Sequence, residues 1–162
     1  MIQDPNLLIA DFRRDVTTVG LKPLGSKIEY ERQPAPHQPH ALPVGKCAVY
    51  IFSLSERYGH QCPAGAHRVL KVGMAGLNSN ARFQSQHYNP HSAPSNVAGV
   101  LIQSRVLWPY LGIPSIREDE VGAWLQKNTD RDNFYLEAVD AELLRNLERY
   151  ARARLGPALE GG

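Results

Sequence analysis

The chain has 162 residues, 43% of them apolar, so it is long enough to bury the core of one compact domain without disulfide support. Its formal charge of +2 is only mildly basic, and its two cysteines are too few for the disulfide framework of a small secreted protein. No apolar run approaches the roughly 18 residues of a membrane span, and no signal-peptide pattern opens the sequence, which predicts a soluble cytoplasmic protein without membrane contact.

The first 44 residues predict a helix followed by a linker. Leu8, Phe12 and Val16 recur at helical spacing, and the preceding Asp4-Pro5 pair favours a helix start. A short extended piece follows at 27–31. The next segment, QPAPHQPHALP at 33–43, holds four prolines, which exclude regular secondary structure. We interpret it as a linker on the surface, and residues 1–44 as an extension of a domain that spans 45–162.

Two short runs rich in β-forming residues open that domain. They are CAVYIF at 47–52 and RVLKVG at 68–73, and they predict neighbouring antiparallel strands. The polar segment 53–67 between them is long for a hairpin loop, and we interpret its Tyr58 and His60 as surface decoration.

The glycines at 73 and 76 end the second strand, and a helix is predicted from Asn78 or Asn80 to about Tyr88. Apolar spacing predicts further helical segments from 97 until Pro109 and at 117–128, a strand at 132–139, and a last helix at 141–155. The order of elements predicts an α+β fold, with a small antiparallel sheet of about three strands flanked by helices.

The last predicted helix places a carboxylate at the boundary of its apolar face. At about 100° per residue, one arc holds the apolar residues Leu143, Leu144, Leu147, Ala151 and Leu155. Glu148 lies just beyond the edge of that arc, where packing holds a side chain while its oxygens reach a cleft, as a metal ligand requires. The alternative is a surface glutamate paired with Arg152 at i+4.

Several short motifs in this order resemble the GIY-YIG nuclease family. The first motif of the family corresponds to Ala48-Val49-Tyr50, and the second to Lys71-Val72-Gly73, close to the Lys-Ile-Gly form of some branches. The family's helix arginine corresponds to Arg82 and its metal-binding glutamate to Glu148. The resemblance spans residues 47 to about 160. It departs from the family at Glu160, where an asparagine is usual, and at Gln86, where the family often has histidine.

The resemblance implies a divalent-metal-dependent endonuclease that hydrolyses phosphodiester bonds in DNA. Glu148 is then the ligand of Mg²⁺ or Mn²⁺, and Arg82 holds the scissile phosphate. Tyr50 is the general base or orients the nucleophile, and Lys71 either lowers the pKa of that phenol or accepts the proton itself. His87, five residues after Arg82, is a weaker catalytic candidate.

Other interpretations stay open. The changed motif residues are compatible with a catalytically reduced domain that binds nucleic acid or a partner protein without cutting. Tyr50 is alternatively a core tyrosine. A zinc site is conceivable from the four residues Cys47, His60, Cys62 and His67. Two cuts are needed to break a duplex, so a homodimer or a partner protein is attractive, and the biological context is open among restriction, phage defence and a mobile element.

Overall fold

The computed structural model describes residues 4–19, 27–59, 68–93, 95–137 and 141–159. Its helices and strands follow the order predicted from the sequence: α1 (Pro5–Thr18), β1 (Glu29–Gln33), β2 (Lys46–Leu54), α2 (Glu56–Gly59), β3 (Val69–Ala75), α3 (Asn80–Gln84), α4 (Val97–Gln103), α5 (Trp108–Leu111), α6 (Val121–Asn128), β4 (Thr129–Glu137) and α7 (Ala141–Leu155). Single 3₁₀ turns are η1 (Gln86–Tyr88), η2 (Arg105–Leu107) and η3 (Glu118–Glu120). None of the described helices is long and apolar enough to cross a membrane.

The strands form one four-stranded antiparallel sheet in the order β1-β4-β2-β3. The α+β fold with an antiparallel sheet is confirmed, but the expectation of about three strands is wrong by one. The additional strand is β1, from the segment interpreted as an extension, and it pairs along β4 from Glu29 opposite Tyr135 to Gln33 opposite Arg131. The predicted pairing of the first two strands of the domain is also confirmed, with Tyr50 directly opposite Gly73.

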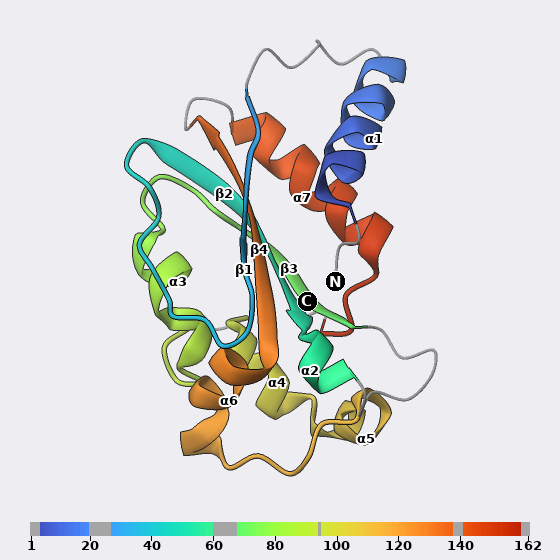
Figure 1. The fold of residues 1–162 in the computed structure, drawn as a ribbon. Coiled ribbons are helices and arrows are strands. Elements are labelled where there is room, and N and C mark those ends of the chain that lie inside the picture. The colour runs from blue at the N-terminus through green and yellow to red at the C-terminus, as the bar shows by residue number, and fades with distance from the viewer. Residues whose placement is uncertain (1–3, 20–26, 60–67, 94, 138–140, 160–162) are drawn as a thin grey trace.

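Helices cover both faces of the sheet (Figure 1). One face packs against α1 and α7 through an apolar cluster that includes Phe12, Val49, Ile51, Phe134 and Leu147. The other face packs against the middle helices through a second cluster, which includes Tyr50, Phe52, Phe83, Leu101 and Leu125. Because both faces are covered, β2 is buried at almost every position and reads as a continuous apolar run.

The last helix has the predicted bounds, and its apolar face is buried as expected. Leu143, Leu144, Leu147 and Ala151 are buried, and Gly156 follows with φ 54°, a left-handed conformation that suits glycine at a helix end. Beyond it, the backbone amides of Ala158 and Leu159 donate to the carbonyl oxygens of Val69 and Leu70 on β3. After α7 the chain therefore pairs with β3, an edge strand of the sheet.

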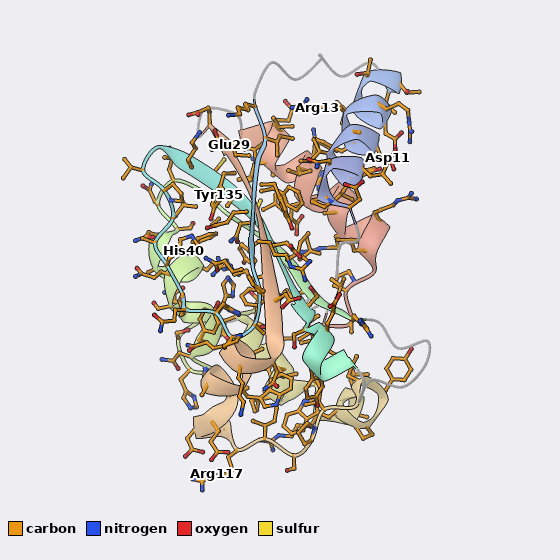
Figure 2. The ribbon with its side chains drawn as sticks, in the orientation of Figure 1. Asp11, Arg13, Glu29, His40, Arg117 and Tyr135 are labelled. Carbon is orange, nitrogen blue, oxygen red and sulfur yellow. The ribbon has the colours of Figure 1, made fainter. Side chains whose placement is uncertain are left out.

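Gln33 ends β1, and from 34 to 43 the proline-rich segment has no regular structure, as predicted. It lies at the surface, but specific buried contacts hold it in place, so it is not a loose linker. His37 is 6% exposed. Its Nδ1 lies 2.9 Å from the carbonyl oxygen of Thr129 and its Nε2 lies 2.8 Å from the Tyr88 hydroxyl. Further along, His40 Nε2 lies 3.1 Å from the hydroxyl of Tyr135 (Figure 2). The segment is thus held to β4 and η1 by side chains that composition alone assigns to solvent.

The loop between β2 and β3 also differs from its interpretation. Tyr58 belongs to the short helix α2, is 5% exposed, and donates a hydrogen bond to the carbonyl oxygen of Gly112. Its ring packs edge-on against Trp124 at 5.2 Å. Tyr58 is therefore a core residue and not decoration. Residues 60–67 lie outside the described residues, and with them the predictions made for His60, Cys62 and His67; Glu160 lies outside them too.

Candidate active site

Four of the five predicted site residues line one pocket. Tyr50 comes from β2, Lys71 from β3, Arg82 from α3 and Glu148 from α7, and together they border a pocket of about 280 Å³. The rest of its lining is Val72, Gly73, Met74, Ser95 and Arg152. The pocket lies beside β3, an edge strand of the sheet, where helices from both layers contact that strand. We call it the β3 pocket.

Larger pockets lie around α6, at about 910 Å³ and 760 Å³. The first is lined largely by apolar and proline side chains, including Pro36, Tyr58 and Trp124. The second borders the turn after Tyr88 and the acidic residues of η3. Neither contains a predicted site residue. The size of a pocket does not decide its chemistry, and it is the β3 pocket that brings a phenol, three cations and a carboxylate together.

Gly73 is required by the position of the Tyr50 ring. The two residues face each other across β2 and β3, and a β-carbon built on Gly73 would lie 2.5 Å from the Tyr50 hydroxyl oxygen. Such an approach is far inside van der Waals contact, so any larger residue would displace the phenol. The glycine of the second motif thus sets where the hydroxyl of the first motif points.

The phenol of Tyr50 is buried, at 1% exposure, yet its ring borders the β3 pocket. Burial raises the pKa of Tyr50, while the charge of Arg82, then that of Arg131, and a hydrogen bond from Arg82 lower it. The cations that act most on this phenol are therefore the two arginines. The sequence had pointed to Lys71, which lies in the same pocket but is not among the principal causes.

Arg82 is fixed by a second contact on the far side of the pocket. Its Nη2 donates to the hydroxyl of Ser95 at 2.8 Å. Ser95 has φ 61°, a left-handed conformation that is uncommon for residues other than glycine, and it lines the pocket. Arg82 therefore contacts both Tyr50 and Ser95, and all three residues line the pocket.

Glu148 is the acidic residue of the pocket lining. It is 9% exposed and accepts a hydrogen bond from Arg152, its partner in an i,i+4 ion pair. Both interpretations of this glutamate thus hold in part: it pairs with Arg152, and it also faces the pocket. No group of three or more histidine, cysteine, aspartate or glutamate side chains suited to a metal is found in the described ranges.

A single carboxylate nevertheless fits Mg²⁺ or Mn²⁺. Mg²⁺ keeps several of its waters and binds through one or two carboxylates together with substrate phosphate, so a complete cage of protein ligands is not needed. The oxygens of Glu148 are hard donors at a pocket wall, and Arg152 is 44% exposed in its side chain, which leaves it able to move away.

His87 lies behind the site and does not line the pocket. It is fully buried, and its ring packs against that of Tyr50 with centroids 4.5 Å apart. Burial, and next the charge of Arg131, lower the pKa of His87 to about 2, so the imidazole is neutral at physiological pH. Neither ring nitrogen has a hydrogen-bond partner among the described residues. Its position suits support of the Tyr50 ring better than contact with a substrate.

Arg131 is a buried residue of the site that the sequence analysis missed. Its Nε donates to Asn133 Oδ1 at 3.0 Å and its Nη1 to the carbonyl oxygen of Phe83 at 2.8 Å. The guanidinium carbon lies 3.9 Å from the centre of the Phe83 ring and 5.5 Å from that of Tyr50. The signal in the sequence is alternation, since Arg131, Asn133 and Tyr135 share one face of β4, but a predicted strand start at residue 132 leaves Arg131 out.

Comparison of the chain with protein-family models, with curated proteins and with solved structures finds no match. The geometry of the β3 pocket is therefore the basis for assigning a function.

Proposed function

We propose that the protein is a divalent-metal-dependent endonuclease of the GIY-YIG type, which hydrolyses phosphodiester bonds in DNA. One observation carries the proposal: Tyr50, Lys71, Arg82 and Glu148, from four separate elements, line the same pocket. A phosphodiester cleaved by water needs an oriented nucleophile, donors for the charge that grows on phosphate, and stabilisation of the leaving oxygen. The side chains of the pocket offer each of these.

The cations of the pocket bind the phosphate. Arg82 presents planar N–H donors to its oxygens, and the ammonium of Lys71 adds a compact positive charge from the neighbouring strand. The hydrogen bond to Ser95 holds Arg82 in place before substrate arrives, so little reorganisation is needed in the transition state.

Tyr50 orients the attacking water. Ionising a phenol of pKa near 10 costs about 4 kcal/mol at pH 7, and burial in this fold adds to that cost while Arg82 and Arg131 reduce it. The hydroxyl is therefore protonated in the resting protein and accepts a hydrogen bond from water. As the water oxygen bonds to phosphorus and releases its proton to solvent, the bond from phosphorus to the leaving oxygen breaks, and the leaving oxygen takes up a proton from solvent.

Glu148 holds the Mg²⁺ or Mn²⁺ ion. A divalent ion held by Glu148 would supply Lewis-acid stabilisation of the negative charge that develops during hydrolysis. Arg152 must release the carboxylate for this, and an incoming phosphate gives its guanidinium another anion to pair with.

A plasmid-cleavage assay with Mg²⁺ or Mn²⁺ tests the proposal. We expect the unaltered protein to nick or linearise the plasmid, and Glu148→Ala to lose at least a hundredfold in rate because the carboxylate is lost. Glu142→Ala is the matched control, since Glu142 is an exposed glutamate on the same helix, and it should cut normally. Equal cutting by Glu148→Ala and the unaltered protein would refute the proposed role of the pocket.

A domain that binds without cleaving is the second candidate. The ion pair between Arg152 and Glu148 favours it, because it occupies the carboxylate that a metal would need. This alternative predicts binding of nucleic acid with no cutting under either metal. An RNA substrate of matched sequence, assayed in parallel, distinguishes a preference for RNA from a lack of activity.

A further inference from the structure

The last helix carries an exposed row of arginines next to the β3 pocket. Arg145, Arg149 and Arg152 are all exposed, and at about 100° per residue they fall within an arc of about 60° on one side of α7. We call these three residues the arginine ridge. Glu148, which lines the pocket, lies between this arc and the buried face of α7, so the ridge is directly beside the pocket.

The positive charge of the ridge is little compensated within the described structure. Arg152 pairs with Glu148, but Arg145 and Arg149 form no ion pair with any described residue. Arg154 differs, because it lies about 180° from Arg145 on the wheel and approaches Asp11 of α1 at 3.7 Å. The helix therefore neutralises an arginine that faces α1 and leaves two on the open side.

The dimensions of the ridge match a nucleic-acid strand. From Arg145 to Arg152 the helix rises about 10 Å at about 1.5 Å per residue. One strand of a duplex carries a phosphate about every 3.4 Å along its axis, so the ridge spans about three phosphates. Guanidinium groups bind phosphate oxygens with paired donors, and such contacts fix the position of a strand without reading its sequence.

We propose that the arginine ridge binds the sugar–phosphate backbone of DNA next to the β3 pocket and so positions the strand for it. This inference rests on the proposed function in taking nucleic acid as the ligand. Arg152, which lines the pocket, joins the two surfaces, and Arg145 and Arg149 contact phosphates outside the pocket.

The test measures binding of a fluorescent DNA duplex of mixed sequence, and of one of its single strands, by anisotropy at several salt concentrations. A Glu148→Ala background prevents cutting during the measurement. The ridge variant carries Arg145→Gln and Arg149→Gln, neither of which lines the pocket. The control carries Arg105→Gln and Arg117→Gln, two exposed arginines of equal total charge. Arg117 lies at the end of the molecule far from α7 (Figure 2).

Each phosphate contact contributes about 0.9 to the slope of log affinity against log salt on duplex DNA. We therefore expect the ridge variant to bind about tenfold more weakly near physiological salt, with a salt slope smaller by about two. The control variant should keep the affinity and the slope of the parent protein. Circular dichroism and urea unfolding establish that both variants are folded. The inference is overturned if the ridge variant and the control variant bind DNA with the same affinity and salt slope, whether or not that affinity is reduced. It is also overturned if the protein with the ridge intact fails to bind DNA at low salt.

These outcomes are separate from failure of the proposed function. Ridge-dependent binding by a protein that never cuts supports the ridge and leaves the domain as a binding module. Normal DNA binding by the ridge variant, together with normal plasmid cutting when the same two substitutions are made in a protein that keeps Glu148, supports the nuclease and overturns the ridge. If loss of the two arginines weakens attachment to anionic lipid vesicles and leaves DNA binding unchanged, the ridge is a membrane surface and the inference is also overturned.

Discussion

The hydroxyl of Tyr50 occupies space that a side chain at residue 73 would fill. Gly73 lies opposite it across two strands, and its missing β-carbon leaves the space that the phenol occupies. Arg82 reaches the same phenol from the pocket side, and Arg131 and His87 pack against its ring from the interior. A small change on β3 therefore moves the group that the proposed reaction depends on.

We predict that Gly73→Ala lowers the rate of DNA cleavage by about ten- to a hundredfold, since misplacing a reacting group by about 1 Å costs that much. The added methyl overlaps the phenol, and overpacking of this kind costs about 1–3 kcal/mol of unfolding free energy. Cleavage assays and urea unfolding measure the two effects.

Gly76→Ala is the matched control, because no atom lies within 4 Å of a β-carbon at that position. It should cut and unfold like the unaltered protein. A Gly73→Ala protein with unchanged activity would show that the contact with Tyr50 does not position the phenol for the reaction.

Among single residues, the sequence predicted those that belong to a motif and missed those whose role depends on tertiary contacts. Tyr50, Lys71, Arg82 and Glu148 were recognisable because their spacing along the chain resembles a family pattern. Arg131 has no such pattern, since its partners are a carbonyl oxygen 48 residues away and three aromatic rings on other elements.

Among the elements, the segment 34–43 differs most from expectation. A proline-rich stretch cannot form a helix or a central strand, but it can still be held by specific side chains. His37 fills this role. A carbonyl oxygen only accepts hydrogen bonds, so the contact with Thr129 places the imidazole proton on Nδ1, and Nε2 is left to accept from the Tyr88 hydroxyl.

We predict that His37→Ala lowers the unfolding free energy by about 2–4 kcal/mol. The substitution removes one hydrogen-bond partner each from the Tyr88 hydroxyl, which keeps a long contact of 3.5 Å with Arg131 Nη1, and from the Thr129 carbonyl, and it removes the ring that packs beside Phe52. Urea unfolding at pH 7 measures the change. His91→Ala is the control, because the His91 side chain is 75% exposed, and it should change stability by less than about 0.5 kcal/mol. Similar losses in both variants would mean that the segment is a loose linker after all.

Apolar periodicity predicts which segments are helical but not always their continuity, because the single helix expected from 97 until Pro109 is split into α4, η2 and α5. Elements whose polar residues find distant partners were predicted less well. The bounds of α7 follow from its apolar spacing. The strand β4 begins three residues before its predicted start, because Thr129, Asp130 and Arg131 look like turn residues. In the fold, His37 contacts Thr129 and Arg32 pairs with Asp130 at 2.6 Å. A sequence read in short windows cannot show partners about a hundred residues away.

For the whole molecule, buried imidazoles make stability depend on pH. An imidazole in the unfolded chain titrates near 6.5, whereas burial in the fold lowers the pKa of His87 to about 2 and also lowers that of His37. Lys71, Arg82 and Arg131 all act on His87 in the same direction. Below about pH 6.5 the unfolded chain binds more protons, so the free energy of unfolding decreases as the pH falls.

We predict that His87→Phe removes part of this dependence. Between pH 7 and pH 5, protonation of His87 in the unfolded chain costs the unaltered protein about 2 kcal/mol, and the variant should be spared that loss. Urea unfolding at the two pH values measures the difference, with His91→Ala as the control that should keep the dependence of the unaltered protein. A His87→Phe protein that loses as much stability on acidification as the unaltered protein would show that the histidine is accessible to protons in the fold.

The pairing of Ala158 and Leu159 with β3 has a further consequence for solubility. An edge strand can pair with a strand from another copy of the protein and so start aggregation, unless the edge strand is covered or carries charge. The C-terminal residues cover β3 at Val69 and Leu70, where their backbone amides bond to its carbonyl oxygens. This backbone pairing therefore occupies part of the edge of the sheet that a second copy of the chain would otherwise be able to extend.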